Sequence, residues 1–341
     1  MEPERNTSEF PARNITILED DLSIHWQTAI WKNQSNPTTF ILLGFGNLRE
    51  LQILFFILFL VIYALSIFGN LLIVLLVVFN QHLHTPMYFF LLNLACLEIC
   101  YTSTILPRML GSFFTGDRSI TIAGCFTQYY FFGFWASSEC HLLAMMSFDR
   151  FLAICKPLHY TSIMNARLCI QLAATSWISG LLGNSIITSF LVQLTFCGSN
   201  EIDDFFCDVY PVANLSCSNT RQVKLATFII GFMATGPPFL LTLTSYVCIF
   251  FTVVQIKSKA AQQKVFATCS SHLIVVTVFY GSLVFVYVIP ETETLKELHK
   301  TFSFFYTILT PMFNPLIYSL RNREVKEAVF KSFKKLSNRV S

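Results

Sequence analysis

Long apolar stretches alternate with short polar segments along most of the chain. Seven of them reach the length of about 20 residues that a helix needs to cross a bilayer core of about 30 Å. The fifth is interrupted by Gly236-Pro237-Pro238 and the seventh by Pro311 and Pro315, and neighbouring helices can satisfy backbone groups that a proline leaves free. The pattern predicts an all-α membrane protein with a bundle of seven transmembrane helices, at about 50–79, 86–110, 122–152, 168–192, 223–255, 265–289 and 301–320.

The composition supports a membrane protein. Of the 341 residues, 54% are hydrophobic and only 13% are charged, whereas soluble domains have about 25% charged residues. We therefore divide the chain into an outer tail (1–47), a seven-helix domain (48–321) and an inner tail with a short amphipathic helix (322–341).

The charge distribution predicts the orientation. With the N-terminus outside, the inner segments contain thirteen of the 23 Lys and Arg residues but only three of the 20 acidic residues. Basic residues gather on the cytoplasmic side of membrane proteins. We expect the inner face to meet anionic lipid and a protein partner, and no nucleic acid.

The polar N-terminal tail is expected to be extracellular and glycosylated. It has neither the basic start nor the apolar core of a secretory signal, so the first span is expected to direct insertion. Sequons begin at Asn6, Asn14 and Asn33, and an outer location would make them accessible for glycosylation.

Four of the eleven cysteines fall in outer segments: Cys125, Cys197, Cys207 and Cys217. An even number in an oxidising compartment predicts two disulfides, and four cysteines allow three pairings.

Asp149 and Arg150 are adjacent at the inner end of the third span. Burying an arginine in the membrane costs several kcal/mol unless it is paired. Asp149 can neutralise Arg150 in a resting state, and release of Arg150 would then act as a switch. The alternative is an arginine that reaches the lipid headgroups.

Glu98 and Glu139 are carboxylic acids inside predicted spans, where ionisable residues are usually functional. Together with amide oxygens they could hold a sodium ion. In the alternative, one or both are protonated and hydrogen-bonded.

Five motifs in order resemble the olfactory (odorant) receptors, a family of rhodopsin-like G-protein-coupled receptors. The resemblance covers about residues 40–335, and the outer loops resemble the tetrapod-type class II members. The motifs are LHTPMYFFL at 83–91, MSFDRFLAICKPLHY at 146–160, Ser245-Tyr246, KVFATCSSHL at 264–273 and PMFNPLIYSLRN at 311–322.

The resemblance assigns roles to single residues. It implies the disulfides Cys125–Cys207 and Cys197–Cys217, and a mid-bundle site for sodium formed by Asn70, Glu98, Glu139 and Asn314. It implies switch roles for Asp149, Arg150, Tyr246, Asn314, Pro315 and Tyr318, with Tyr246 meeting Tyr318 when the bundle opens.

Two further features concern the inner face. Phe148 and Phe151 stand where relatives commonly have tyrosine, so Asp149 and Arg150 are expected to be held mainly by each other. Val325, Val329 and Phe333 recur at four-residue spacing and predict an amphipathic helix on the inner membrane face.

The resemblance also implies a ligand cavity within the bundle. The third span presents several of its residues on one face at helical spacing. Apart from a few hydroxyls the set is apolar and contains no charge, which predicts a small, volatile, weakly polar ligand. The lining residues are Phe132, Gly133, Ala136, Ser137, Cys140, Val209, Ile230, Ala234, Leu283, Val284, Tyr287, Tyr306 and Thr307.

The function implied is odorant binding at the plasma membrane, followed by activation of a stimulatory olfactory-type G protein that raises cyclic AMP. No cofactor is expected besides the sodium ion. The chain lacks the HExxH, GxSxG and P-loop patterns of enzymes. The alternatives are a non-olfactory rhodopsin-like receptor, which usually has tryptophan at the position of Tyr280, and an ion channel or transporter.

Overall fold

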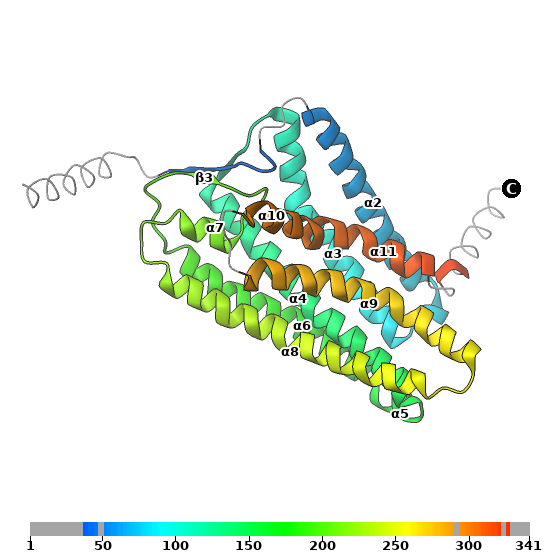
Figure 1. The fold of residues 1–341 in the computed structure, drawn as a ribbon. Coiled ribbons are helices and arrows are strands. Elements are labelled where there is room, and N and C mark those ends of the chain that lie inside the picture. The colour runs from blue at the N-terminus through cyan, green and yellow to red at the C-terminus, as the bar shows by residue number, and fades with distance from the viewer. Residues whose placement is uncertain (1–36, 47–50, 290–293, 322–324, 328–341) are drawn as a thin grey trace, which may run out of the picture.

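The helices run side by side in one bundle (Figure 1). The structure, a computed structural model, describes residues 37–46, 51–289, 294–321 and 325–327. Its long helices are α2 (Gln52–Phe79), α3 (Pro86–Thr115), α4 (Ile122–Cys155), α6 (Ala166–Leu191), α8 (Arg221–Val254) and α9 (Lys259–Val288), followed by α10 (Lys296–Phe304), η3 (Phe305–Leu309) and α11 (Thr310–Arg321). The last three together form the seventh span, so the predicted seven-helix fold is confirmed.

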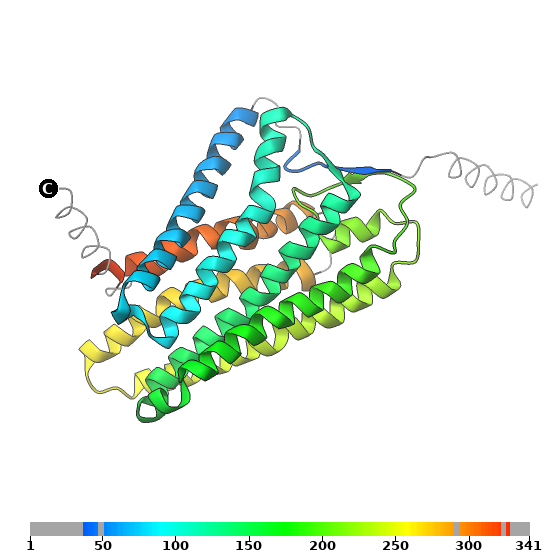
Figure 2. The same cartoon turned by 180° about the vertical axis from the view of Figure 1, so that it is seen from behind.

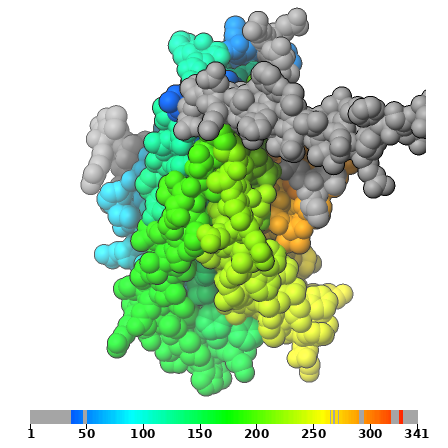
Figure 3. All heavy atoms as spheres, turned by 90° about the vertical axis from the view of Figure 1, so that its left-hand side faces the viewer, coloured from blue at the N-terminus to red at the C-terminus, as the bar shows by residue number. Residues whose placement is uncertain are grey.

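Helix α4 lies at the centre and packs against α3, α6, α8 and α9. The view from behind shows α2 and α3 diverging from the rest at the outer end (Figure 2), and α6 and α8 lie side by side on one face (Figure 3). Helix α2 leaves large apolar side chains exposed, such as Phe68 at 71% and Phe79 at 77%. In a membrane that face meets lipid tails.

Length and apolar composition alone select α2, α3 and α8 as membrane-spanning helices among the described residues, and His272–Val288 of α9 as a shorter apolar helix. Helices α4 and α6 also span the bundle but carry polar residues. Glu139 of α4 and Asn184 of α6 are 0% and 5% exposed, because they face neighbouring helices.

The prolines in the fifth and seventh spans have different effects on their helices. Helix α8 continues through Pro237 and Pro238, so the expected interruption of the fifth span does not break the helix. In the seventh span, the π-helical segment η3 comes before Pro311, and the Thr310 hydroxyl donates to the Phe305 carbonyl over 3.0 Å. Such π segments occur often at functional sites.

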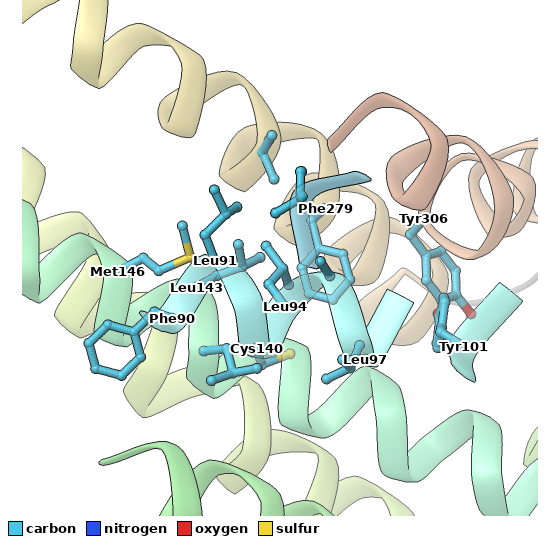
Figure 4. Packing of buried hydrophobic residues seen from close by; sticks show 14 of the residues in the cluster. Phe90, Leu91, Leu94, Leu97, Tyr101, Cys140, Leu143, Met146, Phe279 and Tyr306 are labelled. Carbon is cyan, nitrogen blue, oxygen red and sulfur yellow. The ribbon is translucent and has the colours of Figure 1, made fainter. Parts of the chain in front are cut away.

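Apolar side chains from several helices fill the bundle interior. Phe279 of α9 packs near Leu94 of α3, and Tyr306 of η3 points toward Tyr101 of α3 (Figure 4). All four side chains are at most 1% exposed. The core therefore joins α3, α9 and the seventh span.

A three-stranded sheet covers the outer end. The central strand β1 (Thr39–Leu42) pairs antiparallel with β2 (Ser119–Thr121) and parallel with β3 (Glu201–Ile202). Strand β1 lies within the predicted outer tail, 1–47, so the end of this segment is part of the folded outer face.

The structure contains both predicted disulfides. Cys125 and Cys207 have Cα atoms 5.4 Å apart, and those of Cys197 and Cys217 are 6.1 Å apart. The first ties the loop before α7 (Val209–Asn214) to the start of α4.

Several predicted features lie outside the described residues. They are the sequons at Asn6, Asn14 and Asn33, the side chain of Tyr318, and Val329 and Phe333 of the predicted inner helix. The described part of that segment, 325–327, is helical, and Val325 is buried.

Candidate functional site

A cavity of about 280 Å³ opens between α4, α6, α8 and α9, beneath α7. Most of the predicted ligand-binding residues line it. These are Phe132, Gly133, Ala136, Ser137, Cys140, Val209, Ile230, Ala234, Leu283, Val284 and Tyr287. Tyr306 and Thr307 are not in the lining.

The two remaining predicted residues lie behind the wall. The Tyr306 hydroxyl is 3.1 Å from the Tyr287 hydroxyl, so it affects the cavity through Tyr287. The Thr307 hydroxyl donates to the Ser303 carbonyl over 2.6 Å within its own helix. It is therefore engaged in local backbone bonding.

The expectation of an uncharged lining is wrong. The Asp208 side chain lines the cavity and is 5% exposed. The Tyr287 hydroxyl donates to Asp208 Oδ2 over 2.9 Å. Together with the contact between the Tyr306 and Tyr287 hydroxyls, this bond forms a hydrogen-bonded chain from Tyr306 through Tyr287 to Asp208. The sequence did not indicate Asp208 as a lining residue, because loop residues have no periodicity that assigns them to a face. Its one signal was adjacency to Cys207, which the disulfide to Cys125 draws toward the helices.

Two helices pack closely at the cavity wall. A Cβ atom on Gly133 would collide with the Asn184 side chain of α6, so glycine allows α4 and α6 to approach here. At the cavity floor, the Tyr280 hydroxyl of α9 donates to the Cys140 carbonyl of α4 over 2.7 Å. Tyr280 therefore joins a ligand-lining residue to α9.

The predicted sodium-binding residues gather in the middle of the bundle. Asn314 Nδ2 donates to Glu98 Oε1. Asn70 Nδ2 donates to the Pro311 carbonyl over 3.1 Å and to the Ser66 carbonyl over 3.0 Å. These contacts connect α2, α3 and α11 through polar groups that are all nearly fully buried.

Several oxygens of this cluster lack a hydrogen-bond partner among the described residues. They are Asn70 Oδ1, Glu98 Oε2, both carboxylate oxygens of Glu139 and Asn314 Oδ1. Oxygen donors suit a hard cation, so the residues fit a sodium ion. The described residues contain no group of three or more His, Cys, Asp or Glu side chains suited to a metal, so amide oxygens would have to complete the site.

The predicted switch lies at the inner end of α4. Arg150 donates to Asp149 Oδ2 through Nη2 at 2.7 Å and Nε at 3.1 Å. The Tyr160 hydroxyl of α5 (Pro157–Ile163) donates to Asp149 Oδ1 over 2.8 Å. Asp149 is fully buried. Burial and the Asp149 carboxylate raise the pKa of Tyr160.

Tyr160 corrects the expectation that Asp149 and Arg150 are held mainly by each other. Phe148 and Phe151 have no hydroxyl to offer Asp149. The Tyr160 hydroxyl, eleven residues beyond Asp149, supplies a hydrogen bond instead. The sequence did contain this tyrosine, in the motif that closes the third span. Its partner depended on how α5 folds back against α4.

The remaining switch residues lie on α8 and α11. The Tyr246 hydroxyl lies 2.6 Å from His272 Nδ1 and so connects α8 to α9; the predicted contact with Tyr318 involves a side chain outside the described part. Pro315 packs against Gly69 of α2, where an added Cβ would lie 2.9 Å from Pro315 Cγ.

Comparisons with known proteins show the family to which the chain belongs. Residues 59–336 match the family model "Olfactory receptor". The human proteins Olfactory receptor 11A1 and Olfactory receptor 10A7 are each 46% identical to the chain, over 86% and 88% of it and over 93% and 95% of their own lengths. Human Olfactory receptor 5B21 is 44% identical over 89% of the chain and 98% of its own length.

A solved structure supports the fold. The crystal structure of squid rhodopsin superposes with a TM-score of 0.66 at 18% identity, covering 84% of this chain and 87% of that chain. The seven-helix bundle is therefore the rhodopsin fold. With a family match across most of its length, the chain belongs to the olfactory receptor family of multi-pass membrane receptors.

Proposed function

We propose that this receptor binds a small, volatile odorant in the cavity beneath α7 and then activates a stimulatory, olfactory-type G protein that raises cyclic AMP. The observation that carries the proposal is the mostly apolar cavity with one polar corner formed by Asp208 and Tyr287. Small-molecule sites are mostly apolar with a few placed polar groups. The family already implies an odorant ligand and a heterotrimeric G protein.

The cavity suggests the ligand chemistry. Its volume of about 280 Å³ is near the lower end of the range of about 300–1,000 Å³ for ligand pockets, so the ligand is small. Its polar corner offers a carboxylate acceptor and a phenol. A weakly polar molecule with a single hydroxyl group matches both the apolar walls and this corner.

Contacts of α9 connect the cavity to the inner face. Near the cavity, Tyr280 bonds to the Cys140 carbonyl of α4, and near the inner end His272 bonds to Tyr246 of α8. An odorant that binds better to an open bundle shifts the population toward it. Separation of α9 from α8 would break the Tyr246–His272 contact and expose Arg150 to the G protein.

We assign the N-terminus to the outside of the plasma membrane and the C-terminus to the cytoplasm. The excess of basic residues on the inner segments supports this orientation. The two disulfides also lie at the end that would face the oxidising exterior.

For the mid-bundle cluster we propose a sodium ion held by Glu98 and Glu139 with oxygens from Asn70 and Asn314. The unpartnered buried oxygens of these four residues support it. When bound, the ion would supply positive charge to two carboxylates that are otherwise buried together.

Replacing Tyr287 with phenylalanine tests the ligand cavity. The change removes the donor to Asp208, and a hydrogen bond to a charged group is worth about 1.5–3 kcal/mol. We expect the half-maximal concentration of hydroxyl-bearing agonists in a cyclic AMP assay to rise about tenfold or more. Tyr130→Phe is the matched control, because its hydroxyl contacts Ser185 outside the cavity. Unchanged potency of every agonist at equal surface expression would rule out this cavity.

Replacing Tyr160 with phenylalanine tests the inner switch. Loss of its hydrogen bond to Asp149 weakens the restraint on the Asp149–Arg150 pair, so ligand-free cyclic AMP should rise by about three- to tenfold at matched surface expression. Thr161→Ala, an exposed change on the same short helix, should leave it unchanged. A basal level equal to the unmodified receptor would show that Tyr160 does not restrain the switch.

Sodium dependence of thermal stability tests the mid-bundle site. Sodium chloride should raise the apparent melting temperature of the purified receptor above that in choline chloride of equal ionic strength, because an ion bound only by the folded state stabilises it. Glu139→Gln should abolish the difference, and Glu201→Gln on the outer strand β3 should retain it. Identical melting in both salts would leave hydrogen-bonded acids as the explanation of the cluster.

A further inference from the structure

Residues 39–46, which we call the outer clasp, connect two outer loops by backbone hydrogen bonds. On one side, the Leu42 amide donates to the Arg118 carbonyl over 3.0 Å. On the other, the amides of Leu43 and Gly44 donate to the carbonyls of Ile202 and Asp204 over 2.9 and 3.0 Å. The clasp therefore spans from the loop before α4 to the loop that leads into Cys207.

Arg118 fixes the second half of the clasp. Its Nη1 donates to the Leu43 carbonyl over 3.0 Å and its Nη2 to the Gly46 carbonyl over 2.9 Å. The turn between these carbonyls needs Gly44 and Gly46, whose φ angles of 64° and 88° are unfavourable for other residues. One guanidinium thus bonds to both ends of the turn, a use of its forked donors that lysine reproduces only in part.

Aromatic side chains extend from the clasp to the cavity wall. Phe45 stacks on Phe205 with ring centroids 5.2 Å apart and on Phe59 of α2 at 5.9 Å. Phe205 contacts Phe206 at 4.9 Å, and Phe206 meets Phe132 edge-to-face at 4.8 Å. Phe132 lines the ligand cavity, so four rings join the clasp to it.

The loop that the clasp supports carries Asp208. After Phe206, the chain is held toward α4 by the Cys125–Cys207 disulfide and by the Cys207 amide, which donates to Gln128 Oε1 over 3.0 Å. Those contacts fix the loop from the α4 side. The clasp fixes residues 202–206 from the other side, directly before Asp208.

We infer that the outer clasp is a positioning element for the Asp208 carboxylate and thereby sets agonist potency. Arg118 is the positioning residue that holds its turn. The inference rests on the proposed ligand cavity. Neither the clasp nor Arg118 lines the cavity of Asp208 and Tyr287, so any effect on potency must be transmitted through the loop.

A double-mutant cycle between Arg118 and Asp208 tests the inference. Arg118→Ala should raise the half-maximal concentration of a hydroxyl-bearing agonist about tenfold at matched surface expression, and Arg118→Lys should restore only part of the potency. In an Asp208→Asn receptor, which itself has reduced potency, Arg118→Ala should add less than about twofold, because contacting or coupled sites are not additive. Arg221→Ala, at the outer start of α8, is the control and should leave potency unchanged.

Three outcomes would overturn the inference. Equal Arg118→Ala shifts with and without Asp208→Asn would show that the clasp acts independently of Asp208. A loss of surface expression alone, with unchanged potency of the receptors that reach the surface, would reduce the clasp to a folding element. An Asp208→Asn receptor with unchanged potency would remove the group that the clasp is inferred to position.

A crosslink provides a second test that does not weaken the fold. Ile41 and Ser119 face each other in the antiparallel register, so Ile41→Cys with Ser119→Cys should form a disulfide. The crosslinked receptor should respond within about twofold of the unmodified one. Loss of response would mean that the clasp must detach for activation.

Leu283→Trp, which fills the cavity, tests the proposed ligand cavity independently of the clasp. If agonist potency is unchanged in Leu283→Trp, the proposed function fails whatever the double-mutant cycle shows.

Discussion

The structure depends on one constraint: a polar group inside the bilayer has to find its partner within the bundle. The Pro311 carbonyl shows this most directly. Proline at 315 has no amide hydrogen to donate to it, so Asn70 donates from α2 instead. Asn314, the neighbour of Pro315, donates to Glu98 of α3. Two amide side chains beside Pro315 thus hold three helices together at mid-depth.

The same constraint organises the two ends of the receptor. Toward the outside, Asp208 is buried but accepts a hydrogen bond from Tyr287 at the wall of the cavity. Toward the inside, Asp149 is buried with Arg150 and Tyr160 as partners. Each end therefore holds a buried carboxylate that accepts hydrogen bonds from neighbouring side chains. Helix α4 carries Cys140 at the cavity floor and Asp149 at the switch, so one rigid element passes between them.

The sequence predicted the features that periodicity and charge encode. Apolar length located the seven spans, and helical spacing with the family resemblance placed eleven lining residues around the cavity. What escaped prediction depended on contacts between segments distant in the chain. Asp208 enters the cavity because the disulfide and β3 fold its loop inward, and β1 becomes a strand only by pairing with residues about 80 and 160 positions away. Tyr160 was visible in a motif, but its bond to Asp149 required the fold of α5.

The most direct test of the receptor mechanism is to separate ligand binding from signalling at Arg150. An Arg150→Ala receptor should reach the cell surface and bind agonist, because the cavity lies at the other end of α4, but its agonist-evoked cyclic AMP response should be lost. Arg167→Ala, an exposed inner arginine at the start of α6, should signal normally. A full cyclic AMP response from Arg150→Ala at equal surface expression would contradict the assignment of Arg150 as the coupling residue.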